Sequence, residues 1–123
     1  MPPKDDLLEV IEKSIKKLPE KSIVVIASKV VSIWQGRCIL KEKYRAKDDL
    51  IIEEADVYLP RSFIPGAWVM HTIKNNLFIP SAGVDESNAN GYYVLWPKNI
   101  KGTVKELWQW VKKKYKVKGG HYY

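Results

Sequence analysis

The segment from Ser22 to Trp34 reads SIVVIASKVVSIW and opens with an uninterrupted apolar run. Its first part, Ser22–Ala27, is short and rich in β-branched residues, a composition typical of a strand buried on both faces. Polar residues return immediately afterwards, at Ser28 and Lys29. Because ligands of α/β sheets bind beyond the carboxyl ends of the strands, we expect a central strand that leads directly into a ligand-binding loop.

Helical periodicity is visible in three other places. Asp5 and Asp6 are good N-cap residues, and apolar residues follow them at helical spacing until Pro19. A second helix is expected between Lys47 and Leu59, and a third begins with Thr103 as its cap. The last helix carries an apolar stripe on one face, formed by Val104, Leu107, Trp108, Val111 and Tyr115. Trp110 lies outside this stripe.

Two more strand signals complete the pattern. Apolar runs flank Asn75 and Asn76, which tolerate the positive φ angles of a tight turn, so we predict a hairpin. Another strand is expected over Tyr92–Trp96, before Pro97. The sequence therefore predicts one α/β or α+β domain over residues 1–123, with a mixed sheet, a central buried strand, a hairpin and about three helices.

Composition excludes several classes of protein. The chain has 123 residues, of which 46% are hydrophobic and 28% charged, as in ordinary globular domains. No apolar run approaches the roughly 20 residues that a membrane helix needs, and the N-terminus lacks an export signal, so we expect a cytoplasmic protein. The single cysteine, Cys38, excludes an internal disulfide and is expected to be a buried thiol.

The net charge of +7 is concentrated near the C-terminus. Between Lys98 and Lys118 there are eight lysines and one acid, Glu106. Such a stretch is either a solvated helix face or a basic module that binds nucleic acid without catalysis, and charge alone does not separate the two.

A polar loop, AGVDESNANGYY over residues 82–93, carries the strongest chemical signal. Asp85 and Glu86 supply the hard oxygen ligands that Mg²⁺ or Mn²⁺ prefers. Gly83 and Gly91 would let the backbone approach a ligand closely. A polar turn capped by Asp85 or Ser87 explains the same residues without any ligand.

Three pieces of the sequence together resemble a known family. The stretch SKVVS at residues 28–32, the pair Gly36-Arg37 and the loop AGVDESN at residues 82–88 are similar to the N-terminal half of the coenzyme F(420):L-glutamate ligase, or γ-glutamyl ligase, family. The resemblance runs from Asp5 to about Lys118. The stretch Tyr92–Pro97 looks most like a subgroup associated with folate metabolism.

The resemblance implies a partial γ-glutamyl ligase fold and GTP-dependent amide synthesis with a divalent metal, Mg²⁺ or Mn²⁺. By the family's pattern, Asp85 would bind the metal, and Ser28, Lys29 and Asn88 would contact the nucleotide. Glu86 and Ser87 would support the site.

The implied substrates are GTP, L-glutamate and a carboxylate acceptor of the coenzyme F(420) or folate type. The family's Thr-Asp-Ser-His-like segment, which carries further metal ligands, does not occur in these 123 residues. We therefore expect the chain to act with a partner, either a second copy or a separate second-half chain, or to be inactive alone.

Overall fold

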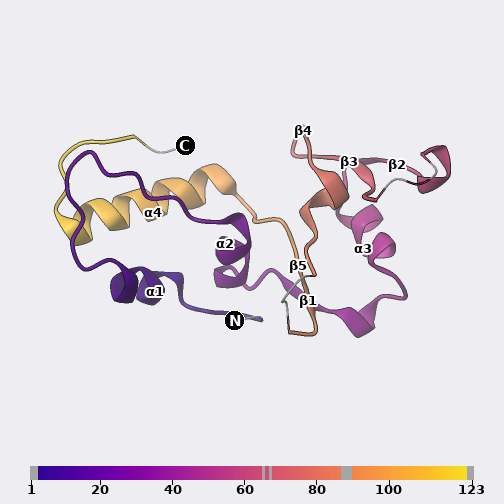
Figure 1. Cartoon of the computed structure of the whole chain (residues 1–123), viewed down its shortest axis with the longest axis horizontal. Coiled ribbons are helices and arrows are strands. Elements are labelled where there is room, and N and C mark those ends of the chain that lie inside the picture. The colour runs from indigo at the N-terminus through magenta and orange to yellow at the C-terminus, as the bar shows by residue number, and fades with distance from the viewer. Residues whose placement is uncertain (1–2, 65, 67, 87–89, 122–123) are drawn as a thin grey trace.

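The computed structural model describes residues 3–64, 66, 68–86 and 90–121. Helices and small antiparallel sheets alternate along the chain, which confirms the mixed α and β class. The elements are α1 (Leu7–Ser14), α2 (Ser28–Trp34), β1 (Cys38–Leu40), α3 (Lys47–Glu54), β2 (Val57–Leu59), β3 (His71–Lys74), β4 (Leu77–Phe78), β5 (Tyr92–Val94) and α4 (Ile100–Tyr115). Figure 1 shows α1, α2 and α4 on one side, β1 and β5 in the middle, and α3 with β2 to β4 on the other side.

The helical side forms around a small apolar cluster. The side chain of Asp6 accepts hydrogen bonds from two backbone amides of α1, as its N-cap position predicts. Leu7 and Ile11 of α1 are then buried against Leu107 of α4. Trp110, which lies off the predicted stripe, packs against the same cluster.

The last helix begins earlier than its sequence pattern predicts. Asn99, rather than Thr103, is the N-cap residue, and its side chain accepts from the amide of Gly102. Thr103 is buried inside the first turns, where its hydroxyl accepts a hydrogen bond from Gln35. The predicted cap was wrong because the Thr103 hydroxyl binds the distant Gln35 side chain, a contact that the local sequence does not reveal.

The strand β5 occupies the middle of the molecule. It pairs antiparallel with β1, with Val94 opposite Cys38. On its other edge, Val94 exchanges two backbone hydrogen bonds with Asp85, of 2.9 and 2.7 Å. Val94 is 1% exposed, so the buried central strand of this fold is β5.

The strand predicted over Ser22–Ala27 is not formed. The segment has no regular secondary structure and belongs to neither sheet, and Ile23 and Val25 are 89% and 86% exposed. The prediction was wrong because such a strand needs a paired strand beside it and packing on both faces, whereas the described chain pairs no strand with it and leaves Ile23 and Val25 uncovered. Burying each such side chain would contribute about 1.5–3 kcal/mol, a stabilisation that this arrangement forgoes.

The sheet on the other side contains the predicted hairpin. Asn75 and Asn76 have φ angles of 53° and 62°, and they join β3 to β4 as the sequence predicts. The second predicted helix ends at Glu54, and Tyr58 instead pairs with Thr72 in β3. A strand partner therefore overrides the helical pattern at the end of that segment.

A strained turn, Pro80–Gly83, connects the hairpin to the polar loop. Ser81 and Ala82 have φ angles of 54° and 49°, which non-glycine residues rarely adopt. Thr72 stabilises the turn, because its hydroxyl accepts from the Ala82 amide at 2.7 Å and donates to the carbonyl of Ile79. Gly83 is required here, since a Cβ atom would lie 2.5 Å from the Trp96 ring.

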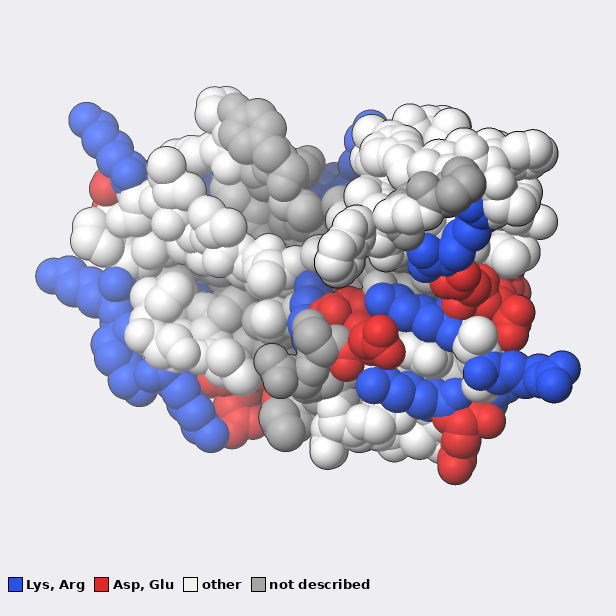
Figure 2. All heavy atoms as spheres, turned by 45° about the vertical axis from the view of Figure 1, so that its right-hand side comes forward, with Lys and Arg blue, Asp and Glu red and all other residues white. Residues whose placement is uncertain are grey.

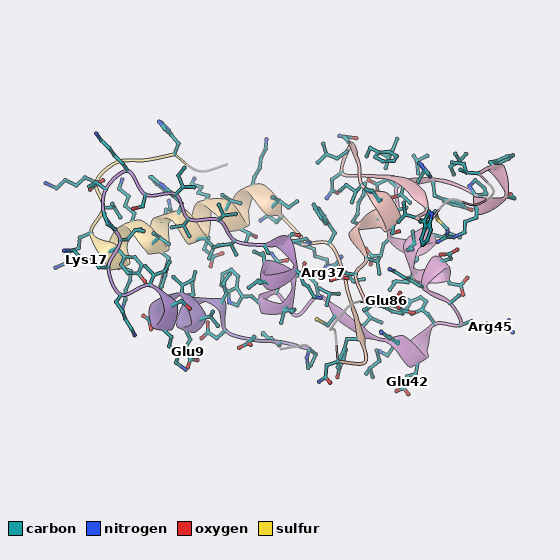
Figure 3. The ribbon with its side chains drawn as sticks, viewed as in Figure 1. Glu9, Lys17, Arg37, Glu42, Arg45 and Glu86 are labelled. Carbon is teal, nitrogen blue, oxygen red and sulfur yellow. The ribbon has the colours of Figure 1, made fainter. Side chains whose placement is uncertain are left out.

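A cluster of charges joins the two sides of the molecule. Arg37 donates to the Trp96 carbonyl and lies 3.3 Å from a carboxylate oxygen of Glu54. Lys74 of β3 contacts the same oxygen at 3.0 Å. All three charged side chains are mostly buried. Figure 3 labels Arg37 at this junction, between α2 and β5.

Two hydroxyl substitutions should have opposite consequences. Thr72→Val removes both hydrogen bonds of a buried hydroxyl and should lower the free energy of unfolding by about 1–3 kcal/mol. Ser32→Ala should leave it unchanged or raise it, because the buried Ser32 hydroxyl has no hydrogen-bond partner within the described residues. Urea denaturation followed by circular dichroism measures both. Equal losses in the two variants would contradict the role given to Thr72.

Candidate functional site

The two sequence motifs meet at an ion pair. The Nζ atom of Lys29 lies 2.7 Å from Oδ2 of Asp85, and their side chains are 31% and 39% exposed. Lys29 is in the first turn of α2, and Asp85 is held by its backbone pairing with Val94. The fold therefore brings together two residues that the family resemblance assigns to one site.

Ser28 begins α2 next to Lys29 and is exposed to solvent. The predicted ligand loop after Ala27 is thus a short helix, and this correction follows from the absence of the strand before it. Asn88 and Ser87, a predicted nucleotide contact and a predicted supporting residue, lie outside the described residues.

Glu86 lies between two lysines that the sequence analysis did not identify. Its carboxylate is 3.8 Å from Lys41 and 3.6 Å from Lys47. Lys41 also lies over the ring of Tyr93, at 5.7 Å from its centroid. Lys41 and Lys47 come from segments before and at the start of α3, so no sequence spacing links them to the loop.

Together, these residues form a site with more positive than negative charge: Lys29, Lys41 and Lys47 with Asp85 and Glu86. Figure 2 shows acidic and basic side chains side by side on this face of the molecule. Among the described residues, no group of three or more His, Cys, Asp or Glu side chains could hold a metal ion. The arrangement suits an anion such as phosphate better than a bare cation.

The carboxylate of Asp85 nevertheless fits a metal that arrives with a nucleotide. Mg²⁺ is usually bound through one or two protein carboxylates together with substrate phosphates and water. Asp85 and Glu86 supply that number of carboxylates, and Lys29 is a mobile point charge suited to phosphate.

Cys38 and His71 lie outside this cluster, and Cys38 is half-buried rather than the buried thiol that the sequence predicts. Burial raises the pKa of the Cys38 thiol above its usual value, so the thiolate is disfavoured. Cys38 and Arg37 line a cavity of about 400 Å³ beside β1. His71 lies in β3 with its ring 5.6 Å from that of Phe78, a packing role without an evident catalytic partner among the described residues.

Among the described helices, none has both the length and the apolar character that crossing a bilayer requires.

Stability measurements should separate the site from the scaffold. Glu54→Gln leaves Arg37 and Lys74 without their shared, mostly buried carboxylate, and should lower the free energy of unfolding by about 3 kcal/mol. Asp85→Asn removes a more exposed ion pair and should change it by less than about 1 kcal/mol. Urea denaturation of both variants tests this difference. A larger loss for Asp85→Asn would mean that the carboxylate is mainly structural.

Comparison with known proteins identifies the family of the chain. The sequence profile described as F420-0:Gamma-glutamyl ligase matches residues 1–120. No curated protein matches the chain significantly. The profile match covers nearly all of the 123 residues and supports a ligase-like function in general. The chain belongs to the F420-0:gamma-glutamyl ligase family.

Proposed function

We propose that this chain binds GTP together with Mg²⁺ or Mn²⁺ and takes part in forming an amide between L-glutamate and a carboxylate acceptor of the coenzyme F(420) or folate type. Family membership supports the ligase class. The single observation that carries the proposal is the 2.7 Å contact between Lys29 and Asp85, which joins the two motifs. We place the reaction in the cytoplasm.

The proposed reaction has two covalent steps. An oxygen of the acceptor carboxylate attacks the γ-phosphorus of GTP, and GDP leaves with the electrons of the broken bond. The amine of L-glutamate then attacks the acyl carbon, loses a proton, and displaces inorganic phosphate. The protein's contribution in both steps is to hold the reactants in line and to offset phosphate charge.

Lys29 and Asp85 exchange partners when the nucleotide binds. In the ligand-free chain each neutralises the other. With GTP and the cation bound, the Lys29 ammonium would contact a phosphate and Asp85 would hold the cation, so that neither charge would be left unpaired. The bound cation supplies charge neutralisation at the phosphates.

The remaining assignments complete the site. Ser28 contacts the nucleotide beside Lys29, and Asn88 contacts it from the polar loop. Glu86 and Ser87 support the loop, with Glu86 kept in place by Lys41 and Lys47. Both lysines also raise the local positive potential, which favours a polyanionic ligand.

A second polypeptide completes the catalytic centre. Two-metal catalysis places a pair of cations about 3.5–4 Å apart and requires several carboxylates. The described cluster offers two carboxylates, Asp85 and Glu86, and each already lies beside a lysine. We propose that a second copy or a separate second-half chain adds the others, and that the chain alone is a poor catalyst.

Titration calorimetry tests nucleotide binding directly. GTP with Mn²⁺ should bind the wild-type chain, whereas Mn²⁺ alone should give little heat because the described residues contain no metal cluster. Asp85→Ala should abolish the metal dependence of GTP binding. Lys29→Gln should weaken binding about tenfold, which corresponds to about 1.4 kcal/mol.

Lys13→Gln is the matched control for Lys29→Gln. It makes the same change of charge at an exposed residue of α1, and binding should be unaffected. Absence of GTP binding in the wild type, or equal weakening by both lysine substitutions, would overturn the proposed site.

One observation favours the alternative of a nucleic-acid-binding module. A cavity of about 620 Å³ at the end of α4 is lined by an aromatic residue, by lysines and by no acid: Trp108, Gln109, Lys112, Lys113, Lys116, Val117 and Lys118. Lys112 lies over the Trp108 ring at 4.7 Å. Aromatic rings and lysines together are the elements of a single-strand binding surface.

If this cavity binds nucleic acid, a fluorescent oligothymidylate should bind in a salt-sensitive manner. Lys113→Ala combined with Lys116→Ala should reduce the affinity and the salt dependence. The matched control, Lys101→Ala with Lys105→Ala, changes two lysines on α4 outside the cavity. If both double variants lowered the affinity equally, the binding would be unspecific charge attraction. That result would reject the nucleic-acid-binding module.

A further inference from the structure

The segment Ser22–Ala27 has the side-chain pattern of a strand with one face uncovered. Ile23 and Val25 point into solvent with 89% and 86% of their surface exposed. Between and after them, Val24 is 37% exposed and Ile26 packs against the cluster of α1 and α4. Alternation of this kind is the period of an extended strand with one face on a core. Figure 1 shows the segment running along α4 before it enters α2.

The backbone of this segment is also unpaired. Within the described residues, no hydrogen bond engages the amides or carbonyls of Ile23, Val24, Val25 or Ile26. The other exposed apolar surface, on β2 to β4, differs because each of its strands is already paired on at least one edge, although β2 and β4 each keep one free edge in the described part of the chain. An exposed segment that is rich in β-branched residues and whose backbone groups are unpaired can form a strand when another strand is added beside it.

Positive charge gathers at the start of the segment. Lys16, Lys17 and Lys21 are exposed, and none forms a salt bridge to any part of the chain that the structure describes. Figure 3 labels Lys17 at this end of the molecule, near the C-terminal end of α4. A second copy would bring the same net charge of +7 to the contact. An incoming strand with acidic residues at this end would instead meet complementary charge.

We propose that Ser22–Ala27 is a docking edge for a β-strand of a different polypeptide, one with alternating apolar residues and acidic residues facing Lys21. Backbone hydrogen bonds to the segment and contacts with Ile23 and Val25 hold it. Because the segment continues directly into Ser28 and Lys29, the far end of the docked strand lies beside the contact between Lys29 and Asp85. The statement that the docked strand reaches the nucleotide site rests on the proposed function. The docking of a strand to Ser22–Ala27 does not depend on it.

Synthetic peptides test the docking without nucleotide. The probes are the fluorescein-labelled peptide Glu-Glu-Thr-Val-Thr-Val-Thr-Val and the same residues in reverse order, since the chain leaves the direction of pairing open. At least one should raise fluorescence anisotropy with the full chain. In hydrogen-exchange mass spectrometry it should slow exchange over residues 22–27 at least tenfold.

Three comparisons make the result specific. A probe with N-methyl groups on alternate amides should lose binding at least tenfold, because strand pairing needs those donors. A probe with lysines in place of the glutamates should also bind at least tenfold more weakly. Ile23→Thr with Val25→Thr should weaken binding about tenfold, while Phe78→Thr, an exposed residue of the already paired β4, should not.

Threonine is β-branched and polar, so it is compatible with the exposed positions at which it is introduced. Circular dichroism verifies that the variants fold. No protection of residues 22–27 by either probe overturns the proposal. It is equally overturned if these residues become protected in the protein alone as its concentration rises, with a dimer in size-exclusion chromatography, because the occupant is then a second copy. Loss of GTP binding with peptide binding intact would reject the proposed function and leave the docking edge standing.

Discussion

The two-sided pairing of β5 at Val94 is the constraint on which the rest of this structure depends. One edge of Val94 faces Cys38 in β1, and the other exchanges both backbone hydrogen bonds with Asp85. Since Val94 is almost completely buried, a shift of register would expose it and break both sets of bonds. The same pairing therefore fixes the core and directs the carboxylate of Asp85 toward α2, where Lys29 meets it.

The strained turn before Asp85 works with this pairing. Ser81, Ala82 and Gly83 all have positive φ angles, an arrangement that persists only where surrounding contacts hold it. Thr72 provides those contacts from the hairpin, and Arg37 with Glu54 and Lys74 joins the hairpin side to β5. The described start of the polar loop, Ala82 to Glu86, is thus positioned by contacts from both the hairpin and β5.

The charge of the cluster favours a polyanionic ligand, such as the proposed nucleotide, over a free metal ion. Three lysines surround two carboxylates, so the cluster is already neutralised and carries a small positive excess. A divalent cation alone would meet repulsion there, whereas a nucleotide brings the negative charge that the lysines favour. In Ser22–Ala27 the local sequence and the observed burial disagree. The sequence is typical of a buried strand, but its side chains at Ile23 and Val25 stay exposed in the single chain.

The sequence by itself determined the features whose causes lie within a few residues. Asp6 caps α1, Asn75 and Asn76 form the hairpin turn, and the apolar stripe of α4 contains its buried Leu107, because capping, turn geometry and periodicity are local properties. The paired motifs likewise indicated the family, and the structure brings Lys29 and Asp85 of these motifs into contact. Only the tertiary structure decided that β5 rather than Ser22–Ala27 is buried, and that Lys41 and Lys47 hold Glu86. Burial and ion pairing depend on which distant segments meet, and no spacing along the chain contains that information.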